Sequence, residues 1–201
     1  TGQQNIAIGM DAVRDITDAS YNIGIGTYAL SANTSGNYNL AIGYRAMAGT
    51  GTGDFNSAYG YDALRSLTSG ASNIGIGKDA GDLITTGSNN VIIGNNAQAS
   101  AVGVSNEIVI GQGADGQGQN TITLGGDATS GVYMGEDSGA TVYAGGLNIG
   151  GAAVTSTAAE LNILDGSATS ATSTTIVDAD RVVVNDDGTM IQVAMSDVKA
   201  Y

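Results

Sequence analysis

The carboxylates are the side chains in this sequence that could support acid–base catalysis. The chain has no His and no Cys, which excludes a Ser-His-Asp triad, a Cys nucleophile and a His-based metal site. Glycoside hydrolysis needs only two carboxylates, and the candidates are Glu107, Asp115, Asp127, Glu136 and Asp137. All five lie in turn-like settings, and no Trp is present to line a sugar site. We therefore expect no catalytic residue and no enzymatic activity, with polysaccharide degradation as the enzymatic alternative.

Calcium is the cofactor to which the remaining carboxylates are best suited, because they supply hard oxygen ligands. The candidates are Asp178, Asp180, Asp186 and Asp187. No EF-hand loop or Gly-rich calcium-binding repeat accompanies them. The Gly-rich segment Gly111–Gly116 also lacks the strand and helix of a phosphate site. We expect solvated turns here, and no bound metal or cofactor, with calcium as the alternative.

Charge and composition exclude several classes of partner. The formal net charge is −13 with only 6 Lys and Arg, which argues against binding to nucleic acid or to an anionic membrane surface. No apolar run is long enough to insert into a membrane, and no signal peptide is visible. The chain has 32 Gly but no Trp and a single Phe, so a thick globular core is hard to build. We expect a thin, regular architecture, and a segment of a longer protein.

A repeat of 17 residues dominates the first two thirds of the chain. One ladder of Asn and one of Gly recur at this period, and Ala follows each Gly three residues later. The ladder positions are Asn5, Asn22, Asn39, Asn56, Asn73, Asn90, Gly9, Gly26, Gly43, Gly60, Gly77, Gly94 and Gly111. Glu107 replaces Asn in the last full copy, and a shortened copy follows from Asn120 to Ala128.

Each copy reads as one turn of a solenoid. Two apolar residues flank a middle residue between Asn and Gly, which is the two-residue period of a strand, and Gly then permits a corner with positive φ. Apolar residues on the return path are Val13, Leu30, Met47 and Leu64. The sequence predicts an all-β solenoid of seven coils with two short strands per coil, rising about 34 Å.

The middle residue of each strand is never polar, although it points away from the flanking apolar pair. A strand face that meets water should carry polar residues, so both faces look buried, and one chain can bury only one. We therefore predict that the middle residues pack against other copies of the chain. These oligomer-facing positions are Ala7, Gly24, Ala41, Ala58, Gly75, Ile92 and Val109.

Two further sets of residues recur on the repeat. The Asn side chains can hydrogen-bond from coil to coil, and Tyr21, Tyr38 and Phe55 share one repeat position and should stack. Tyr44 and Tyr61 follow the Gly corner and are expected to be exposed. These two tyrosines are a candidate binding patch, with ordinary surface decoration as the alternative.

The copies Asn22-Ile-Gly-Ile-Gly-Thr-Tyr-Ala29 and Asn73-Ile-Gly-Ile-Gly-Lys-Asp-Ala80 resemble the head repeats of trimeric autotransporter adhesins. Related repeats occur in bacteriophage tail fibres. The resemblance covers about residues 1–128 and implies a left-handed parallel β-roll that forms a tight homotrimer. The repeat of that family is often shorter, so a longer outer turn is expected here.

Two later segments resemble phage structural proteins. Residues 155–166, Thr-Ser-Thr-Ala-Ala-Glu-Leu-Asn-Ile-Leu-Asp-Gly, resemble a segment recurrent in tail-fibre proteins. Residues 178–190 resemble a segment of marine phage structural proteins. Both resemblances imply a virion fibre rather than a bacterial adhesin.

The C-terminal third is predicted to differ from the roll. After the repeat domain at 1–128, we expect tapering short strands over 129–150, including 132–134 and 141–143. A short helix over 156–165, with capping-box spacing between Thr157 and Glu160, forms a neck within 151–175, which ends in a Ser/Thr linker. Residues 176–201 are expected to hold a β-hairpin around Asn185–Gly188.

The resulting expectation is a structural fibre segment of a phage virion, which acts as a rigid spacer and attaches to the host surface. Its partners would be copies of itself, other virion proteins and a host cell-surface glycan or protein. The alternatives are a trimeric adhesin or filament subunit on a bacterial cell surface and a polysaccharide-degrading tailspike. The neighbouring domains of the full protein would separate the first two.

Overall fold

The computed structural model describes residues 2–126 and 128–129, together with the backbone of four strands further along the chain. The chain divides into two compact units, Thr1–Ser138 and Gly139–Tyr201. The first unit holds the repeats and is described first.

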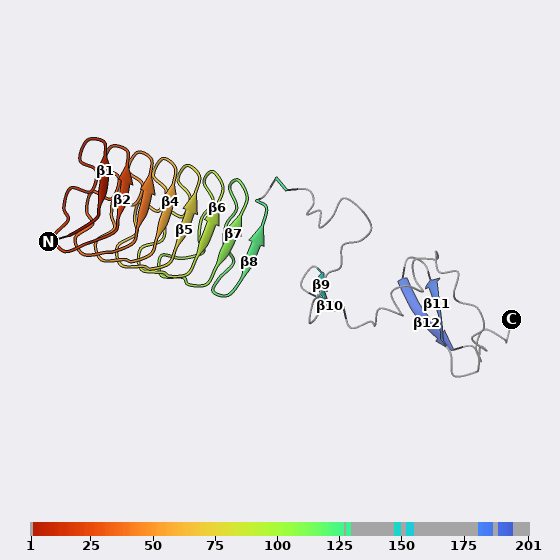
Figure 1. Ribbon diagram of the computed structural model, residues 1–201. Coiled ribbons are helices and arrows are strands. Elements are labelled where there is room, and N and C mark those ends of the chain that lie inside the picture. The colour runs from red at the N-terminus through yellow and green to blue at the C-terminus, as the bar shows by residue number, and fades with distance from the viewer. Residues whose placement is uncertain are drawn as a thin grey trace, which may run out of the picture. The chain divides into compact units, whose positions relative to one another are not determined.

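Eight parallel strands form a single sheet in which each strand pairs with the next along the chain (Figure 1). One strand comes from each successive coil, and equivalent repeat positions lie opposite each other, as Ala41 lies opposite Ala58. The prediction of an all-β solenoid of stacked coils is confirmed. The strands are β1 (Ile6–Ile8), β2 (Ile23–Ile25), β3 (Leu40–Ile42), β4 (Ser57–Tyr59), β5 (Ile74–Ile76), β6 (Val91–Ile93), β7 (Ile108–Ile110) and β8 (Ile122–Leu124).

The last coil is shorter than the others. Ile108 pairs with Ile122, so β7 and β8 are separated by 14 residues. Thr121, rather than Asn120, therefore precedes the strand at the position of the buried Asn. Asn120 lies one place earlier, in the left-handed conformation with φ 62°, so the predicted start of the shortened copy was wrong by one residue.

Each strand ends at a glycine corner that only Gly can fill. The corner glycines have φ between 127° and 147° from Gly9 to Gly111. A Cβ on Gly43 would lie 2.3 Å from the carbonyl oxygen of Gly60 in the next coil. The close stacking of corners therefore explains why this ladder is invariant from coil to coil.

The prediction of a second strand in each coil was wrong. On the return path, alternate residues adopt the left-handed conformation, as at Leu30 (φ 52°) and Met47 (φ 50°). The backbone still bonds from coil to coil, and Leu30 N donates to Ala46 O at 3.0 Å. A β-strand needs an extended backbone at every residue, and the left-handed residues of the return path interrupt it. The return paths of successive coils are therefore stacked turns that are hydrogen-bonded to one another.

The middle residues of β2 to β7 point into the coil, so the prediction that they face other copies of the chain was wrong for Gly24, Ala41, Ala58, Gly75, Ile92 and Val109. Ala41, Ala58, Ile92 and Val109 belong to the buried core of the single chain, and Gly24 and Gly75 are also buried. Ala7 is exposed in the first coil, β1.

The physical reason for this arrangement is the narrow interior. A Cβ on Gly24 would lie 2.5 Å from Val13 Cγ2, and a Cβ on Gly75 would lie 2.6 Å from Leu64 Cγ. Small strand residues are therefore needed opposite large return-path residues. The flanking apolar pairs, which would not fit inside, lie on the outer face of the sheet.

The second unit contains two antiparallel strand pairs. Strand β9 (Leu147–Ile149) pairs with β10 (Ala152–Val154), and β11 (Arg181–Asp186) pairs with β12 (Thr189–Ala194). The sequence did not predict β10. Turn residues 187–188, the helix predicted over 156–165 and the strands predicted at 132–134 and 141–143 lie outside the described residues.

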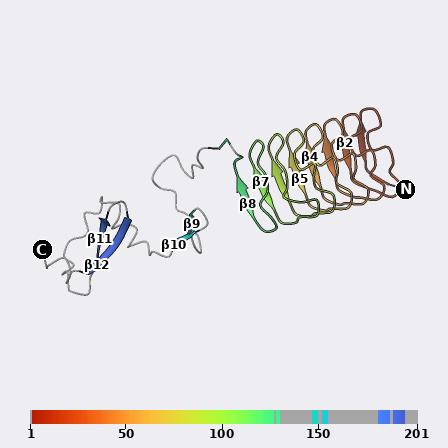
Figure 2. The same cartoon turned by 180° about the vertical axis from the view of Figure 1, so that it is seen from behind.

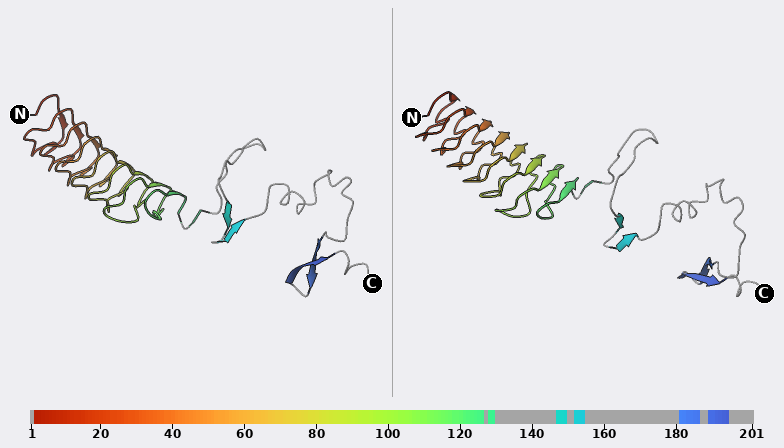
Figure 3. Two further views of the ribbon diagram at one scale, coloured as in Figure 1. Left: turned by 90° about the horizontal axis from the view of Figure 1, so that it is seen from below. Right: turned by 60° about the horizontal axis from the view of Figure 1, so that its bottom comes forward.

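Figures 2 and 3 show the first unit from behind, from below and obliquely, and in each view its coils stack along one direction. Among the described residues, no helix has the length and apolar character needed to cross a membrane.

Candidate functional site

The outer face of the eight-stranded sheet is the strongest candidate for a functional surface. It consists of the two outward side chains of each strand from β1 to β8, and we call it the exposed sheet face. Its first ladder is Ile6, Ile23, Leu40, Ser57, Ile74, Val91, Ile108 and Ile122. Its second ladder is Ile8, Ile25, Ile42, Tyr59, Ile76, Ile93, Ile110 and Leu124.

The exposed sheet face is apolar, and its side chains are partly or largely exposed in the single chain. Ile8 is 58% exposed, Ile76 is 41% exposed and Tyr59 is 61% exposed. Neither ladder contains a charged residue, and Ser57 and Tyr59 are its only side chains with a polar group. Contiguous apolar surface of this kind marks an interaction site in soluble proteins.

The sequence reasoning missed this face because it assigned the flanking apolar pairs to the core. A signal for the correct assignment is present in the repeat. Asn22 and Gly24 are two residues apart, so both side-chain positions lie on the same side of the strand. Asn recurs at this position in six successive coils, which is typical of a buried hydrogen-bonded ladder. If the Asn side chain lies inside the coil, the middle residue of the strand lies inside as well.

The asparagine ladder holds each strand at its start. Asn56 N donates to Asn39 Oδ1 at 2.9 Å, and Asn73 N donates to Asn56 Oδ1 at 2.9 Å. The side-chain nitrogen of Asn56, Nδ2, also donates to Gly70 O at 2.9 Å, on the return path of the same coil. One buried side chain thus links two coils and closes its own turn. This pattern runs from Asn5 to Asn90.

Glu107 ends the asparagine ladder and is fully buried. Its backbone N donates to Asn90 Oδ1 at 2.9 Å, and its carboxylate accepts from Ser100 N at 3.0 Å and from Gly118 N at 2.8 Å. The Glu107 side chain therefore accepts from two backbone N–H groups, whereas the side-chain nitrogen of a ladder Asn such as Asn56 donates to a backbone carbonyl.

The structure describes two of the five carboxylates that were candidates for hydrolysis, Glu107 and Asp115. Glu107 is buried and engaged by the backbone, whereas Asp115 is exposed. The other three candidates, Asp127, Glu136 and Asp137, lie outside the described residues, as do the side chains of the four calcium candidates. Within the described part of the chain, no three acidic or other metal-binding residues gather in one place.

The aromatic residues at the shared repeat position stack as predicted. The ring centroids of Tyr21 and Tyr38 are 4.8 Å apart, and those of Tyr38 and Phe55 are 5.0 Å apart, with nearly parallel planes. Each ring is about half exposed. Since the stacked faces cover one another, mainly ring edges meet the solvent.

A second aromatic group lies beyond the glycine corner. The rings of Tyr44 and Tyr61 stack with centroids 5.1 Å apart, and the Arg45 guanidinium lies 5.2 Å from the centroid of Tyr44. Arg45 is held by a bidentate ion pair with the buried carboxylate of Asp62, and this hydrogen bonding raises the pKa of Arg45 above its ordinary value. We call Tyr44, Tyr61 and Arg45 the tyrosine corner.

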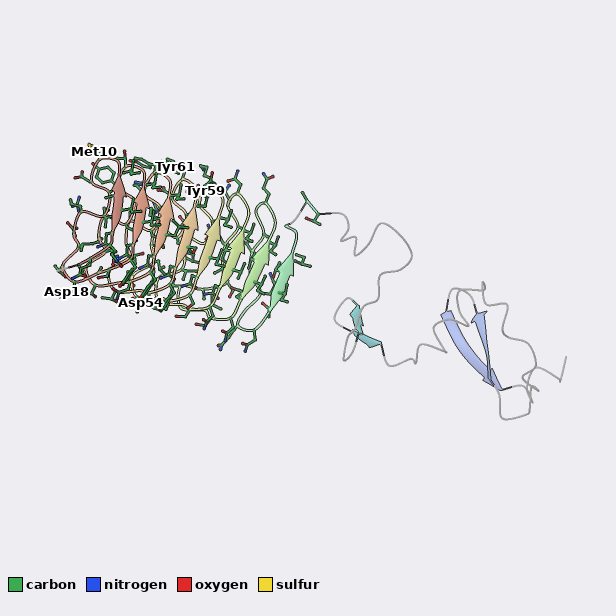
Figure 4. All side chains as sticks on the ribbon, in the orientation of Figure 1. Met10, Asp18, Asp54, Tyr59 and Tyr61 are labelled. Carbon is green, nitrogen blue, oxygen red and sulfur yellow. The ribbon has the colours of Figure 1, made fainter. Side chains whose placement is uncertain are left out.

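Figure 4 shows Met10 and Tyr61 along one long edge of the solenoid and Asp18 and Asp54 along the opposite edge. The tyrosine corner therefore lies on the long edge opposite Asp18 and Asp54. It offers rigid, amphipathic side chains, which are the residue types that dominate recognition surfaces.

Comparisons with protein-family models, with curated proteins and with solved structures gave no match to this sequence.

Proposed function

We propose that this chain is a structural fibre segment that assembles with copies of itself through the exposed sheet face. The observation that carries the proposal is the pair of ladders on that face, which are apolar except at β4 and contain no charged residue from β1 to β8. Covering apolar surface is the main driving force for association. A solenoid also gains length by adding coils, without needing a thick core.

The copy number that we propose is three. The resemblance of the repeats to trimeric autotransporter heads supports this number, and the apolar face along one side of a straight solenoid suits packing around a common axis. The trimer would bury the ladders of all three copies and form a stiff rod.

We place the fibre on a phage virion, where it would contact other virion proteins. The support is the resemblance of residues 155–166 and 178–190 to phage structural segments. A bacterial surface adhesin or filament subunit is the alternative, since it would use the same assembly physics. A tailspike that degrades polysaccharide is the second alternative.

For attachment to the host, we propose the tyrosine corner as the contact surface. It lies beyond the strand ends, so assembly through the exposed sheet face would leave it accessible. Its partner would be a host cell-surface glycan or protein. Each contact would be weak by itself, and several fibres bound at once would strengthen attachment.

The proposal is tested by native mass from light scattering, before and after substitution on the exposed sheet face. We expect the wild-type chain to have the mass of three copies and to resist brief heating in detergent. We expect Ile76→Asp to yield a folded monomer. Ile76 is 41% exposed in the single chain, so the charge should not disturb folding, but it would prevent association through the exposed sheet face.

Leu83→Asp is the matched control, because Leu83 is 40% exposed but lies outside the strands. This variant should keep the wild-type mass. A folded wild-type monomer, or equal loss of mass in both variants, would refute assembly through this face.

A further inference from the structure

Strand β4 is unlike every other strand of the exposed sheet face. The other seven carry two residues drawn from Ile, Leu and Val, whereas β4 carries Ser57 and Tyr59. Tyr59 is 61% exposed and is the most exposed outward side chain of β1–β7. The face therefore has a projection at Tyr59 and, two residues away on the same strand, a depression at Ser57.

Neighbouring strands define the edges of both features. Ser57 pairs with Leu40 on one side and Ile74 on the other, and Tyr59 pairs with Ile42 and Ile76. A partner whose surface is flat opposite β4 would leave a void over Ser57 and would clash with Tyr59. A complementary partner needs a depression and a projection in the opposite order.

A second copy of this chain provides that order in one orientation only. When two sheet faces meet with their coils parallel, their strands run in opposite directions across the interface, so Ser57 faces Tyr59 of the neighbour. When the coils are antiparallel, the strands run the same way, and Ser57 would face Ser57 while Tyr59 faced Tyr59. A threefold ring of parallel coils keeps the first pairing, because each strand start meets a neighbour's strand end.

The hydroxyl groups favour the same pairing. A Tyr hydroxyl that becomes buried usually finds a hydrogen-bond partner. Ser57 is the only other side chain of the exposed sheet face that can supply one. If the copies shifted by one coil, Tyr59 would lie opposite Leu40 or Ile74, where its hydroxyl would have no side-chain partner and the interface would be overpacked.

We infer that Ser57 and Tyr59 set the orientation and register of the assembly. Copies lie with their coils parallel and their β4 strands level, and Tyr59 of each copy occupies the depression at Ser57 of its neighbour. This inference rests on the proposed assembly through the exposed sheet face. A single polar layer in an apolar interface is an established way to specify register.

Cysteine pairing between copies tests the inference directly, because the chain has no Cys. Copies carrying Ser57→Cys are mixed during assembly with copies carrying Tyr59→Cys, oxidised, and separated without reductant. We expect linked pairs in this mixture. We expect none from Ser57→Cys alone, and none when Ser57→Cys is mixed with Ile76→Cys, which lies one coil away.

Strong linkage in Ser57→Cys alone would show antiparallel coils, and preferential linkage to Ile76→Cys would show a shifted register. Either result overturns the inference while leaving the proposed function intact. A monomeric wild-type chain would instead overturn the proposed function, and this inference would fall with it.

Melting temperatures of the assembled protein give an independent measurement. Ser57→Ile places a large residue beneath the neighbour's Tyr59 and should lower the melting temperature by about 5 °C. The double variant Ser57→Ile/Tyr59→Ile makes β4 like its neighbours and should recover most of that loss. A double variant that is as unstable as the sum of the single variants would count against the pairing.

Discussion

At the scale of single residues, the buried asparagines explain how such short strands stay in register. Each strand from β1 to β8 has only three residues, so its backbone hydrogen bonds are few. Asn39 and Asn56 add bonds from the strand start to the next coil and to the return path of the same coil. The ladder therefore stabilises both the stacking and the closure of each turn.

Replacing one ladder residue should be costly. Asn56→Ala would leave Gly70 O and Asn73 N, both in buried surroundings, without the bonds that they make to Asn56. We expect a loss of about 3 kcal/mol in the free energy of unfolding, because unpaired buried polar groups carry most of their desolvation penalty. Urea unfolding measures this loss. Asn95→Ala, at an exposed position, is the control and should change stability little.

Thr50 offers the opposite case, a residue whose replacement should stabilise the chain. It is fully buried, and its hydroxyl has no hydrogen-bond partner among the described residues. Leu67 and Ile84, which occupy the same repeat position in the next two coils, are apolar and buried. We expect Thr50→Val to raise the free energy of unfolding by about 1 kcal/mol, since the shape is kept and an unpaired polar group is removed. A destabilised variant in thermal unfolding would contradict this account.

The proposed role of the tyrosine corner in attachment to host cells can also be tested with residue changes. Tyr44→Ala/Tyr61→Ala removes both stacked rings, and we expect binding to host cells to fall at least about tenfold if these rings anchor the contact. The native mass should be unchanged. Tyr21→Ala, in the other aromatic stack, is the control, and equal losses in both variants would argue against a specific corner site.

At the scale of elements, the interior of the solenoid is a series of size-matched pairs. The strand residue of one coil packs on the return-path residue of the coil before it, as Gly75 does on Leu64. In one pair the small residue lies on the return path and the large residue on the strand. Gly81 occupies the return-path position, and a Cβ there would lie 2.9 Å from Leu64 Cδ2 and 3.3 Å from Ile92 Cγ1. Large side chains therefore need not come from the same element in every coil.

This exchange predicts coupling between two positions. Gly81→Leu alone should clash with Ile92, and Ile92→Gly alone should leave a cavity. The double variant restores the Leu–Gly pairing of Leu64 and Gly75, so we expect it to be more stable than the sum of the single effects by about 2 kcal/mol. The backbone should allow this, since Leu64 already has φ 49° and Gly81 has φ 64°. Additive effects in a double-mutant cycle would refute the pairing.

At the scale of the whole molecule, each coil contacts mainly its neighbours, so the solenoid should tolerate removal of a complete coil. Deleting residues 57–73 joins Asn56 to Ile74 and brings Gly75 against Met47, a pairing that fits the interior. Deleting residues 74–90 removes the same 17 residues of length but brings Ile92 against Leu64. We expect the first variant to fold with a slightly lower melting temperature and the second to be destabilised far more.

Circular dichroism and thermal unfolding of the two deletion variants check this expectation. Equal stability of the two would mean that the interior pairs do not matter, and failure of both to fold would mean that the coils are not modular.

The repeat itself was open to prediction from sequence. The period of 17 residues fixes which residues stack, because any other register would separate the Asn positions from one another and the Gly corners from one another. The aromatic stack of Tyr21, Tyr38 and Phe55 follows from the same period. These features depend on identity and spacing along the chain, which are visible without coordinates.

The direction in which each strand faces follows from the tertiary structure, and in the sequence only the spacing between the Asn ladder and the middle residue signals it. Both sides of β2 to β7 are mostly apolar, so alternation alone does not distinguish inside from outside. The width of the interior makes the choice, since Val13 and Leu64 leave no room for a side chain at Gly24 and Gly75. The larger isoleucines are thereby placed on the surface, where they form the exposed sheet face. The return path likewise carries left-handed residues such as Leu30, because stacking against the next coil outweighs the local preference of the residue.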